Sequence, residues 1–332
     1  VGPTDFTLQI LHSSDLEGGV EALGRAANYA AIIDSLEGEY SNTIVISSGD
    51  NYIPGPFFNA AADGSLRPTL QYVYENALGL PSANNAIREG NGRVDISIMN
   101  VIGFDASAIG NHEWDAGANI FGDLIQPDIR TGPSARWIGA QFPYLSANLD
   151  FSGDAGLNSV YSSSILPNTD FQTDVNNLNA ASNVPRLAPA TVITRNGEKI
   201  GVVGATTQLL QSISSPGNVS VIGGGSNDMV QLAGVLQPYI DDLIQNEGAD
   251  KIILTTHLQQ FSLEQQLIGL LSGVDIVIAG GSDFLLADAN DVLLPGDVAQ
   301  GTYPFATVNA DGDSALIIST DGQYKYVGRL VI

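Results

Sequence analysis

The chain has 332 residues, 44% of them hydrophobic and only 14% charged, so it can bury a large core and is not a disordered protein. Its 36 acidic and 12 basic residues give a formal net charge of −24, which disfavours binding to a nucleic acid duplex or an anionic membrane. The absence of cysteine excludes disulfides, zinc–thiolate sites and thiol nucleophiles. Its apolar stretches are too short for membrane insertion.

The composition also suggests where the protein works. Lysine occurs only at Lys199, Lys251 and Lys325, and the acidic residues are scattered along the chain. A lysine-poor, cysteine-free, acidic chain is typical of an exported bacterial protein in a saline or calcium-containing medium. We therefore expect a secreted, periplasmic or cell-surface location in a bacterium.

Short strand-like runs alternate with helix-like patterns along most of the chain. In chain order, the pattern predicts a strand at 6–12, a helix at 24–36, strands at 43–48, 105–109 and 199–204, a helix at 229–245, and strands at 251–258 and 274–279. This alternation is typical of helices packed over largely buried sheets.

Two long segments, 54–93 and 148–189, interrupt the alternation with residues typical of loops, apart from a helical pattern at 70–77. Long loops in a compact domain are usually functional or mobile, so we interpret both segments as insertions over a surface site. Turn signals between alternating runs at 303–332 predict a β-meander. We expect one domain over residues 1–332.

Polar side chains follow several of the predicted buried strands. His112 lies in the motif GNHEWD at 110–115, His257 ends the strand at 252–257, and Asp50 follows the strand at 43–48. The ends of buried strands are where open α/β sheets place their sites. His12, which precedes two serines, is interpreted as structural.

This arrangement suits a two-metal centre. Two divalent cations about 3.5–4 Å apart need a bridging carboxylate and further oxygen and nitrogen ligands, and together they turn a bound water into hydroxide near neutral pH. Asp50 is the natural bridge. The other candidate ligands are Asp15, Glu17, Asn111 and His257. The alternative for the aspartates is turn chemistry after a strand.

His112 is the candidate catalytic residue that does not bind a metal. A histidine in this role protonates the leaving oxygen or stabilises the developing charge. Asp115 could fix the tautomer of the His112 imidazole and raise its basicity.

The ordered motifs resemble those of the calcineurin-like metallophosphatases, in the branch of 5′-nucleotidases and 2′,3′-cyclic phosphodiesterases. The motifs that carry the resemblance are Asp15-Leu16-Glu17, Gly49-Asp50-Asn51, Gly110-Asn111-His112-Glu113, Thr256-His257 and Gly280-Gly281-Ser282-Asp283. The resemblance extends from Phe6 to the end of the chain. It implies a four-layer α/β/β/α sandwich of two mixed sheets.

Two departures from the family pattern change the expected ligands. Glu17 replaces a histidine of the first motif, and Gly281 and Asp283 replace the two histidines of the last. The resemblance then implies one ion held by Asp15, Glu17, Asp50 and Asp283. The second ion would have Asp50, Asn111 and His257, and a main-chain carbonyl or a water could fill the position at Gly281.

These ligands bear on which ions are bound. An all-carboxylate first site favours Ca²⁺, Mg²⁺ or Mn²⁺, whereas imidazole-rich sites suit zinc. We therefore expect two divalent ions from the group Mn, Mg, Ca and Zn, but not zinc in both sites.

The implied function is metal-dependent hydrolysis of a small phosphate ester, most simply a nucleotide, as in a 5′-nucleotidase or cyclic phosphodiesterase. The alternatives are a broad-specificity alkaline phosphatase and a secreted metal-binding pseudoenzyme, and the pairing of His112 with Asp115 argues against the latter. In two-domain relatives a C-terminal domain carries the nucleotide specificity, and we expect it to be missing from these residues.

Overall fold

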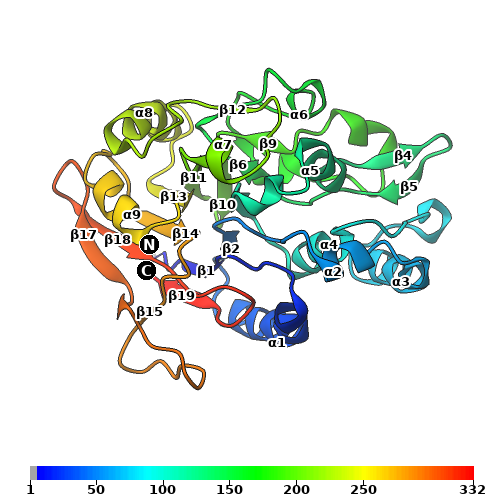
Figure 1. Ribbon diagram of the computed structural model, residues 1–332, viewed down its shortest axis with the longest axis horizontal. Helices are drawn as coiled ribbons and strands as arrows, with labels where there is room; N and C mark the ends of the chain where they lie inside the picture. The colour runs from blue at the N-terminus through cyan, green and yellow to red at the C-terminus, as the bar shows by residue number, and fades with distance from the viewer. Residues whose placement is uncertain (1–5) are drawn as a thin grey trace.

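Two β-sheets packed face to face form the centre of the protein, as a computed structural model shows for residues 6–332 (Figure 1). The first sheet has the order β19 (Gly328–Val331), β1 (Gln9–Ser13), β2 (Thr43–Ser47), β3 (Ala106–Ala108), β6 (Tyr144–Leu145) and β9 (Leu187–Ala188). The second has the order β17 (Phe305–Val308), β18 (Ser314–Ile318), β14 (Ile276–Gly280), β13 (Lys251–His257), β11 (Glu198–Thr206), β10 (Ala190–Arg195) and β8 (Leu166–Pro167).

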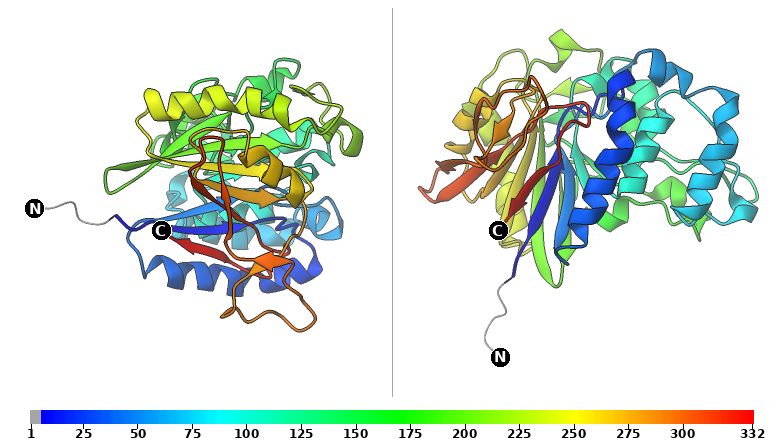
Figure 2. Two further views of the ribbon diagram at one scale, coloured as in Figure 1. Left: turned by 90° about the vertical axis from the view of Figure 1, so that its left-hand side faces the viewer. Right: turned by 90° about the horizontal axis from the view of Figure 1, so that it is seen from below.

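Helices cover the outer face of each sheet. On the first sheet these are α1 (Val20–Glu37), α3 (Arg67–Asn76), α4 (Arg93–Ile102) and α5 (Ala118–Ile125). On the second sheet they are α8 (Met229–Gln245) and α9 (Phe261–Ile268). In the left view of Figure 2, α8 lies above the strands and α1 below them. Both sheets mix parallel and antiparallel pairs, so the predicted four-layer α/β/β/α sandwich is confirmed.

The alternation of side chains along each strand explains the layers. Ile44 and Ile46 of β2 point into the core between the sheets, whereas Val45 packs under the helices of the first sheet. On β13, Ile253 faces the inner core and Leu254 faces α8 and α9. Because both faces of these central strands are buried, the strands are continuous apolar runs. Full burial of each such side chain contributes about 1.5–3 kcal/mol.

The segments predicted as loops contain short elements. Residues 54–93 include α2 (Pro56–Ala60), η1 (Gly64–Leu66), α3 and η2 (Ser82–Asn84). Residues 148–189 include β7 (Leu149–Asp150), α6 (Ala155–Asn158), β8, η4 (Asn168–Phe171), η5 (Leu178–Asn183) and β9. The remaining elements are η3 (His112–Trp114), β4 (Asp128–Arg130), β5 (Ser134–Trp137), α7 (Leu210–Ile213), β12 (Ser220–Val221), β15 (Leu286–Ala287) and β16 (Gly301–Thr302).

The predicted β-meander at 303–332 is wrong in its last strand. β17 and β18 form the expected antiparallel hairpin in the second sheet. β19 instead crosses to the first sheet, where it pairs antiparallel with β1. Leu330 of β19 is buried in the core between the sheets, so the crossing closes that core at its edge.

None of the helices within residues 6–332 is long and apolar enough to cross a membrane.

Candidate metal centre

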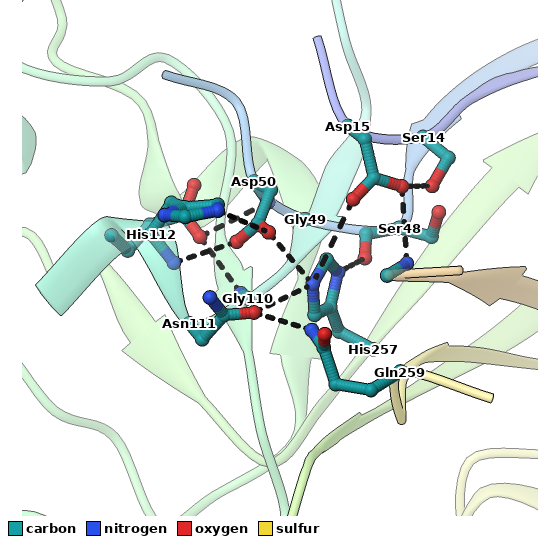
Figure 3. Close-up of polar contacts among 12 residues, drawn as sticks. Ser14, Asp15, Ser48, Gly49, Asp50, Gly110, Asn111, His112, His257 and Gln259 are labelled. Atoms are coloured by element: carbon teal, nitrogen blue, oxygen red, sulfur yellow. Dashed lines mark hydrogen bonds and ion pairs between the residues drawn. The ribbon is translucent and has the colours of Figure 1, made fainter. Parts of the chain in front are cut away.

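The site residues follow parallel strands from both sheets. β1, β2 and β3 are parallel neighbours, as are β13 and β14, so their carboxyl ends lie at one edge of the sandwich. The loops after these strands carry the motifs singled out in the sequence. Figure 3 shows how the side chains from the two sheets meet there.

Unusual backbone conformations are concentrated in these loops. Among residues 6–332, eight non-glycine residues have positive φ, and five of them belong to this edge: Asp15 (49°), Glu17 (52°), Asp50 (52°), Gln259 (72°) and Asp283 (49°). A non-glycine residue in this region costs about 1–2 kcal/mol and persists only where its surroundings enforce it. The conformation turns each side chain out of the strand direction and toward the common edge.

Asp50 lies at the centre of the cluster and is 2% exposed. Its Oδ1 accepts a hydrogen bond of 2.8 Å from the His112 backbone N–H, and its Oδ2 lies 2.9 Å from His257 Nε2. Burial alone would raise the pKa of Asp50, but the charge and hydrogen bond of His257 and the nearby His112 outweigh burial and lower it. The glycine of the GNHEWD motif is explained by the same contact, because a Cβ at Gly110 would lie 2.1 Å from Asp50 Oδ1.

His257 is fully buried, and the first sheet fixes its orientation. Its Nδ1 donates a 2.7 Å hydrogen bond to the Ser48 carbonyl oxygen, which leaves Nε2 directed at Asp50 and 3.2 Å from Asn111 Oδ1. A backbone carbonyl on one ring nitrogen is a common way to orient a histidine ligand of a metal. Burial lowers the pKa of His257, but Asp50 and Asp15 dominate and raise it to about 10.

Asp15 lies on the other side of His257. Its Oδ1 is 3.9 Å from His257 Nε2, and its Oδ2 accepts hydrogen bonds from the Gly281 N–H at 3.0 Å and from the Ser14 hydroxyl. Burial, followed by the charge of Asp50, raises the pKa of Asp15 to about 7, against the opposing charge of His257.

Glu17 and Asp283 are more exposed than Asp15. Glu17 Oε1 lies 3.7 Å from His112 Nε2, and burial followed by neighbouring acids raises its pKa. Asp283 stands beside the backbone of the β18–β19 connection, where a Cβ at Gly322 would lie 2.9 Å from its Oδ1. Burial and then the charge of Asp321 raise the pKa of Asp283. Its carboxylate is not among the tightly grouped donor atoms at this edge.

His112 and Asp115 form the predicted pair. His112 Nδ1 lies 2.5 Å from Asp115 Oδ2, and the other oxygen of Asp115 accepts a 2.6 Å hydrogen bond from the Ser214 hydroxyl. The His112 Nε2 atom therefore faces the centre of the cluster, 3.8 Å from Asp50 Oδ2. Burial opposes protonation, but Asp50 and then Asp115 raise the pKa of His112.

Sequence reasoning did not identify two residues of this site. The fully buried Glu113 carboxylate accepts hydrogen bonds from the backbone N–H groups of Gly110 (2.8 Å), Asp50 (3.1 Å) and Asn51 (2.8 Å), so it ties two site loops together. Gln259 donates a hydrogen bond from Nε2 to Asn111 Oδ1. The available signal was its position two residues after His257, just beyond the end of β13.

The donor set fits a pair of divalent cations. Donor atoms of Asp15, Asp50 and His257 lie within 4.8 Å of one another, as do those of Glu17, Asp50 and His112. The two groups share Asp50, as a bridging carboxylate requires. They differ from the ligand sets expected from the sequence, because the first joins ligands of both expected ions and the second includes His112, which is expected to act without binding a metal. Carboxylates outnumber imidazoles in both groups, which suits Mn²⁺, Mg²⁺ or Ca²⁺ better than zinc.

His12 and most of the aromatic side chains near the motifs are buried and serve the packing of the interior. His12 is buried, stacks on Tyr303 and makes a 3.0 Å hydrogen bond with its hydroxyl, and burial lowers the pKa of His12 to about 3. Of the aromatic side chains near the motifs, Phe57 is 38% exposed, and the others are buried in the core: Tyr52, Phe58, Trp114 and Trp137.

The chain is similar in sequence to proteins named as nucleotidases and phosphoesterases. The chain is 26% identical over 341 residues to a 5′-nucleotidase from Diplobatis ommata, covering 98% of this chain and 45% of that protein. It is 25% identical over 291 residues to the trifunctional nucleotide phosphoesterase protein YfkN of Bacillus subtilis, covering 87% of this chain and 16% of that protein. The chain thus spans less than half the length of these relatives. No protein-family model matches it.

Solved structures agree on the fold. A 5′-nucleotidase precursor from Thermus thermophilus superposes with a TM-score of 0.64 at 22% identity, over 98% of this chain and 51% of that one. The calcineurin-like phosphoesterase YfkN gives a TM-score of 0.54 at 18% identity, over 98% of this chain and 84% of that one. The fold is therefore that of the metallophosphatases, and the resemblance to the 5′-nucleotidase branch is confirmed over nearly the whole chain.

Proposed function

We propose that this protein is a dinuclear metal-dependent phosphoesterase that hydrolyses nucleotides. The observation that carries the proposal is the position of Asp50, which two groups of donor atoms share at the carboxyl edge of both sheets. The names of the relatives, 5′-nucleotidases and a nucleotide phosphoesterase, support the substrate class. Because the chain spans less than half the length of these relatives, we propose hydrolysis of a nucleotide phosphate and no particular base or ester.

The proposed ligands are those of the sequence analysis. One ion would be held by Asp15, Glu17, Asp50 and Asp283, and the other by Asp50, Asn111 and His257. When bound, such ions neutralise phosphate charge and lower the pKa of water. The negative charges of Asp15, Asp50 and Glu17 in the cluster, and of Asp283 beside it, would attract them. We propose Mn²⁺, Mg²⁺ or Ca²⁺ for the oxygen-rich site.

His112 is proposed to handle the proton. In hydrolysis, the oxygen of water bonds to phosphorus, the ester P–O bond breaks, and the leaving oxygen takes up a proton. The Nε2 atom of His112 faces the cluster, and Asp115 holds Nδ1, so the ring has one fixed orientation. The carboxylate of Asp115 on Nδ1 stabilises the imidazolium form of His112, as a donor to the leaving oxygen needs.

The test combines metal analysis with turnover. Purified protein is assayed for metal content and for phosphate release from AMP, cyclic AMP isomers and p-nitrophenyl phosphate. His112→Ala is expected to keep the metal content and to lower kcat by about 10²- to 10⁴-fold. Gln266→Ala, on the exposed face of α9, is the control and should match the wild type.

Each other outcome has a definite meaning. Unchanged turnover in His112→Ala would refute the role of His112. Equal rates on AMP and p-nitrophenyl phosphate would favour a broad-specificity alkaline phosphatase. Metal binding without turnover under any metal supplement would favour the pseudoenzyme.

We also propose that the protein acts outside the cytoplasm of a bacterium. The acidic, lysine-poor and cysteine-free composition supports an exported protein. Fractionation of the source cells would test this, and activity confined to the cytoplasm would contradict it.

A further inference from the structure

The second metal position lacks a side chain at Gly281, and a neighbour occupies the space. A Cβ built on Gly281 would lie 2.7 Å from Gln259 Nε2 and 2.8 Å from His257 Nε2. Gly281 also has φ +82°, which strains any other residue. The carboxamide of Gln259 therefore stands where a side chain at position 281 would begin.

The position of Gln259 is enforced by its surroundings. Its φ of 72° is the highest positive value among the non-glycine residues 6–332, and it lies two residues after the end of β13. The half-buried side chain turns back over His257 and donates a hydrogen bond from Nε2 to Asn111 Oδ1 (Figure 3). Backbone strain of this kind, at about 1–3 kcal/mol, is concentrated at functional sites.

The contacts of Gln259 place it in the second ligand group. Asn111 Oδ1 is 3.2 Å from His257 Nε2, which in turn is 2.9 Å from Asp50 Oδ2. Gln259 is thus joined through Asn111 to all three proposed ligands of the second ion. Because residue 281 is glycine, no side chain at that position occupies the space that the Gln259 carboxamide fills.

We propose that the side-chain oxygen of Gln259 is the fourth protein ligand of the second ion, in place of a side chain at position 281. The inference rests on the proposed dinuclear centre. A glutamine amide carries an acceptor oxygen and a donor nitrogen on one carbon, and rotation about the last side-chain bond exchanges them. Without a cation, Gln259 Nε2 donates its hydrogen bond to Asn111 Oδ1. When a cation binds Asn111 Oδ1, rotation of the amide would turn Gln259 Oε1 toward the same cation.

The assignment has a consequence for metal choice. With Gln259, the second ion has three oxygen donors, from Asp50, Asn111 and Gln259, and one nitrogen donor from His257. An imidazole at position 281 would have given two nitrogen donors. The change to an amide oxygen shifts the preference from zinc toward Mn²⁺, Mg²⁺ or Ca²⁺.

The test measures Mn²⁺ binding directly, without turnover. Calorimetry gives the number of ions and their affinities, and electron paramagnetic resonance reports the spin coupling of a Mn²⁺ pair. Wild type is expected to bind two ions with a coupled spectrum. Gln259→Ala and the size-matched Gln259→Met should bind the second ion at least about tenfold more weakly, with loss of the coupled signal.

Two further variants complete the design. Gln259→Glu keeps an oxygen donor at the same distance along the side chain, so it should retain two ions and the coupled spectrum. Gln260→Ala removes the exposed neighbouring glutamine and should match the wild type. Circular dichroism confirms that each variant is folded.

The outcomes separate this assignment from the proposed function. Two ions bound to Gln259→Met with the affinities of Gln260→Ala would overturn the role of Gln259 and leave the dinuclear centre intact. Fewer than two ions in the wild type at saturating Mn²⁺ would overturn the dinuclear centre, and this assignment with it.

Discussion

Glu264 offers a test of how burial sets the charge state inside this fold. The side chain lies on α9, is 0% exposed, and packs against β13, where its Oε1 accepts a 3.1 Å hydrogen bond from the Thr256 hydroxyl. Its Oε2 has no hydrogen-bond partner among residues 6–332. Burial raises the pKa of Glu264 from 4.5 to about 8, although hydrogen bonds and His257 oppose the increase.

The pKa difference fixes the sign of the effect on stability. The folded protein holds this proton more tightly than the unfolded chain, so the free energy of unfolding falls as pH rises from about 4.5 to about 8. Each pH unit in that window costs about 1.4 kcal/mol, or roughly 3 kcal/mol by pH 7. The neutral amide of Glu264→Gln does not ionise. The variant is therefore expected to gain roughly 3 kcal/mol over wild type between pH 4.5 and pH 7.

Urea unfolding followed by circular dichroism measures this difference at pH 5, 6, 7 and 8. The same chelator in every sample keeps metal binding from adding a pH dependence of its own. Glu21→Gln, which removes a carboxylate that is 74% exposed, is the control and should change stability by less than about 0.5 kcal/mol throughout. A difference between Glu264→Gln and wild type that stays constant from pH 5 to pH 8 would refute the reasoning.

Two other predictions concern the metal ligands. Gly110→Ala places a Cβ 2.1 Å from Asp50 Oδ1, so it should displace the carboxylate and weaken Mn²⁺ binding at least about tenfold by calorimetry; wild-type affinity would contradict the close approach. Metal binding at pH 7 should release between about one and two protons, because ligands bind deprotonated and the pKa values of His257 and Asp15 are raised to about 10 and about 7. Metal affinity should therefore rise with pH, and a binding enthalpy that does not change between buffers would count against this.

The strands and helices of the layers were well predicted because their patterns are local, whereas the four-layer sandwich itself was implied by the resemblance to the metallophosphatases. β2 and β13 are buried on both faces, so each is a short apolar run that can be recognised without its neighbours. The helix at 229–245 has the same bounds in the structure as in the sequence pattern. By contrast, β19 was assigned to the wrong sheet, because its partner β1 lies at the other end of the chain and no local pattern specifies that pairing.

The sequence likewise predicted part of the site, namely the residues that lie at the ends of strands. Asp15, Asp50, Asn111 and His257 stand at strand ends, and parallel strands bring such ends to one edge, so their meeting followed from order alone. Gln259 could not be predicted, because its role depends on the left-handed backbone that turns it back over His257. Glu113 was missed for a related reason: a glutamate inside a motif gives no sign that its carboxylate bonds three backbone N–H groups of two loops.

The hydrogen bond from His257 to the Ser48 carbonyl joins residues of the two sheets. Asp50 follows β2 of the first sheet, and His257 ends β13 of the second, so an ion held between them would fasten the halves of the sandwich at one end. Folding and metal supply would then be linked, since a ligand that binds only the folded state stabilises it by about 2.7 kcal/mol at a hundred times its Kd. Metal depletion would therefore weaken the contact between the two sheets at this end.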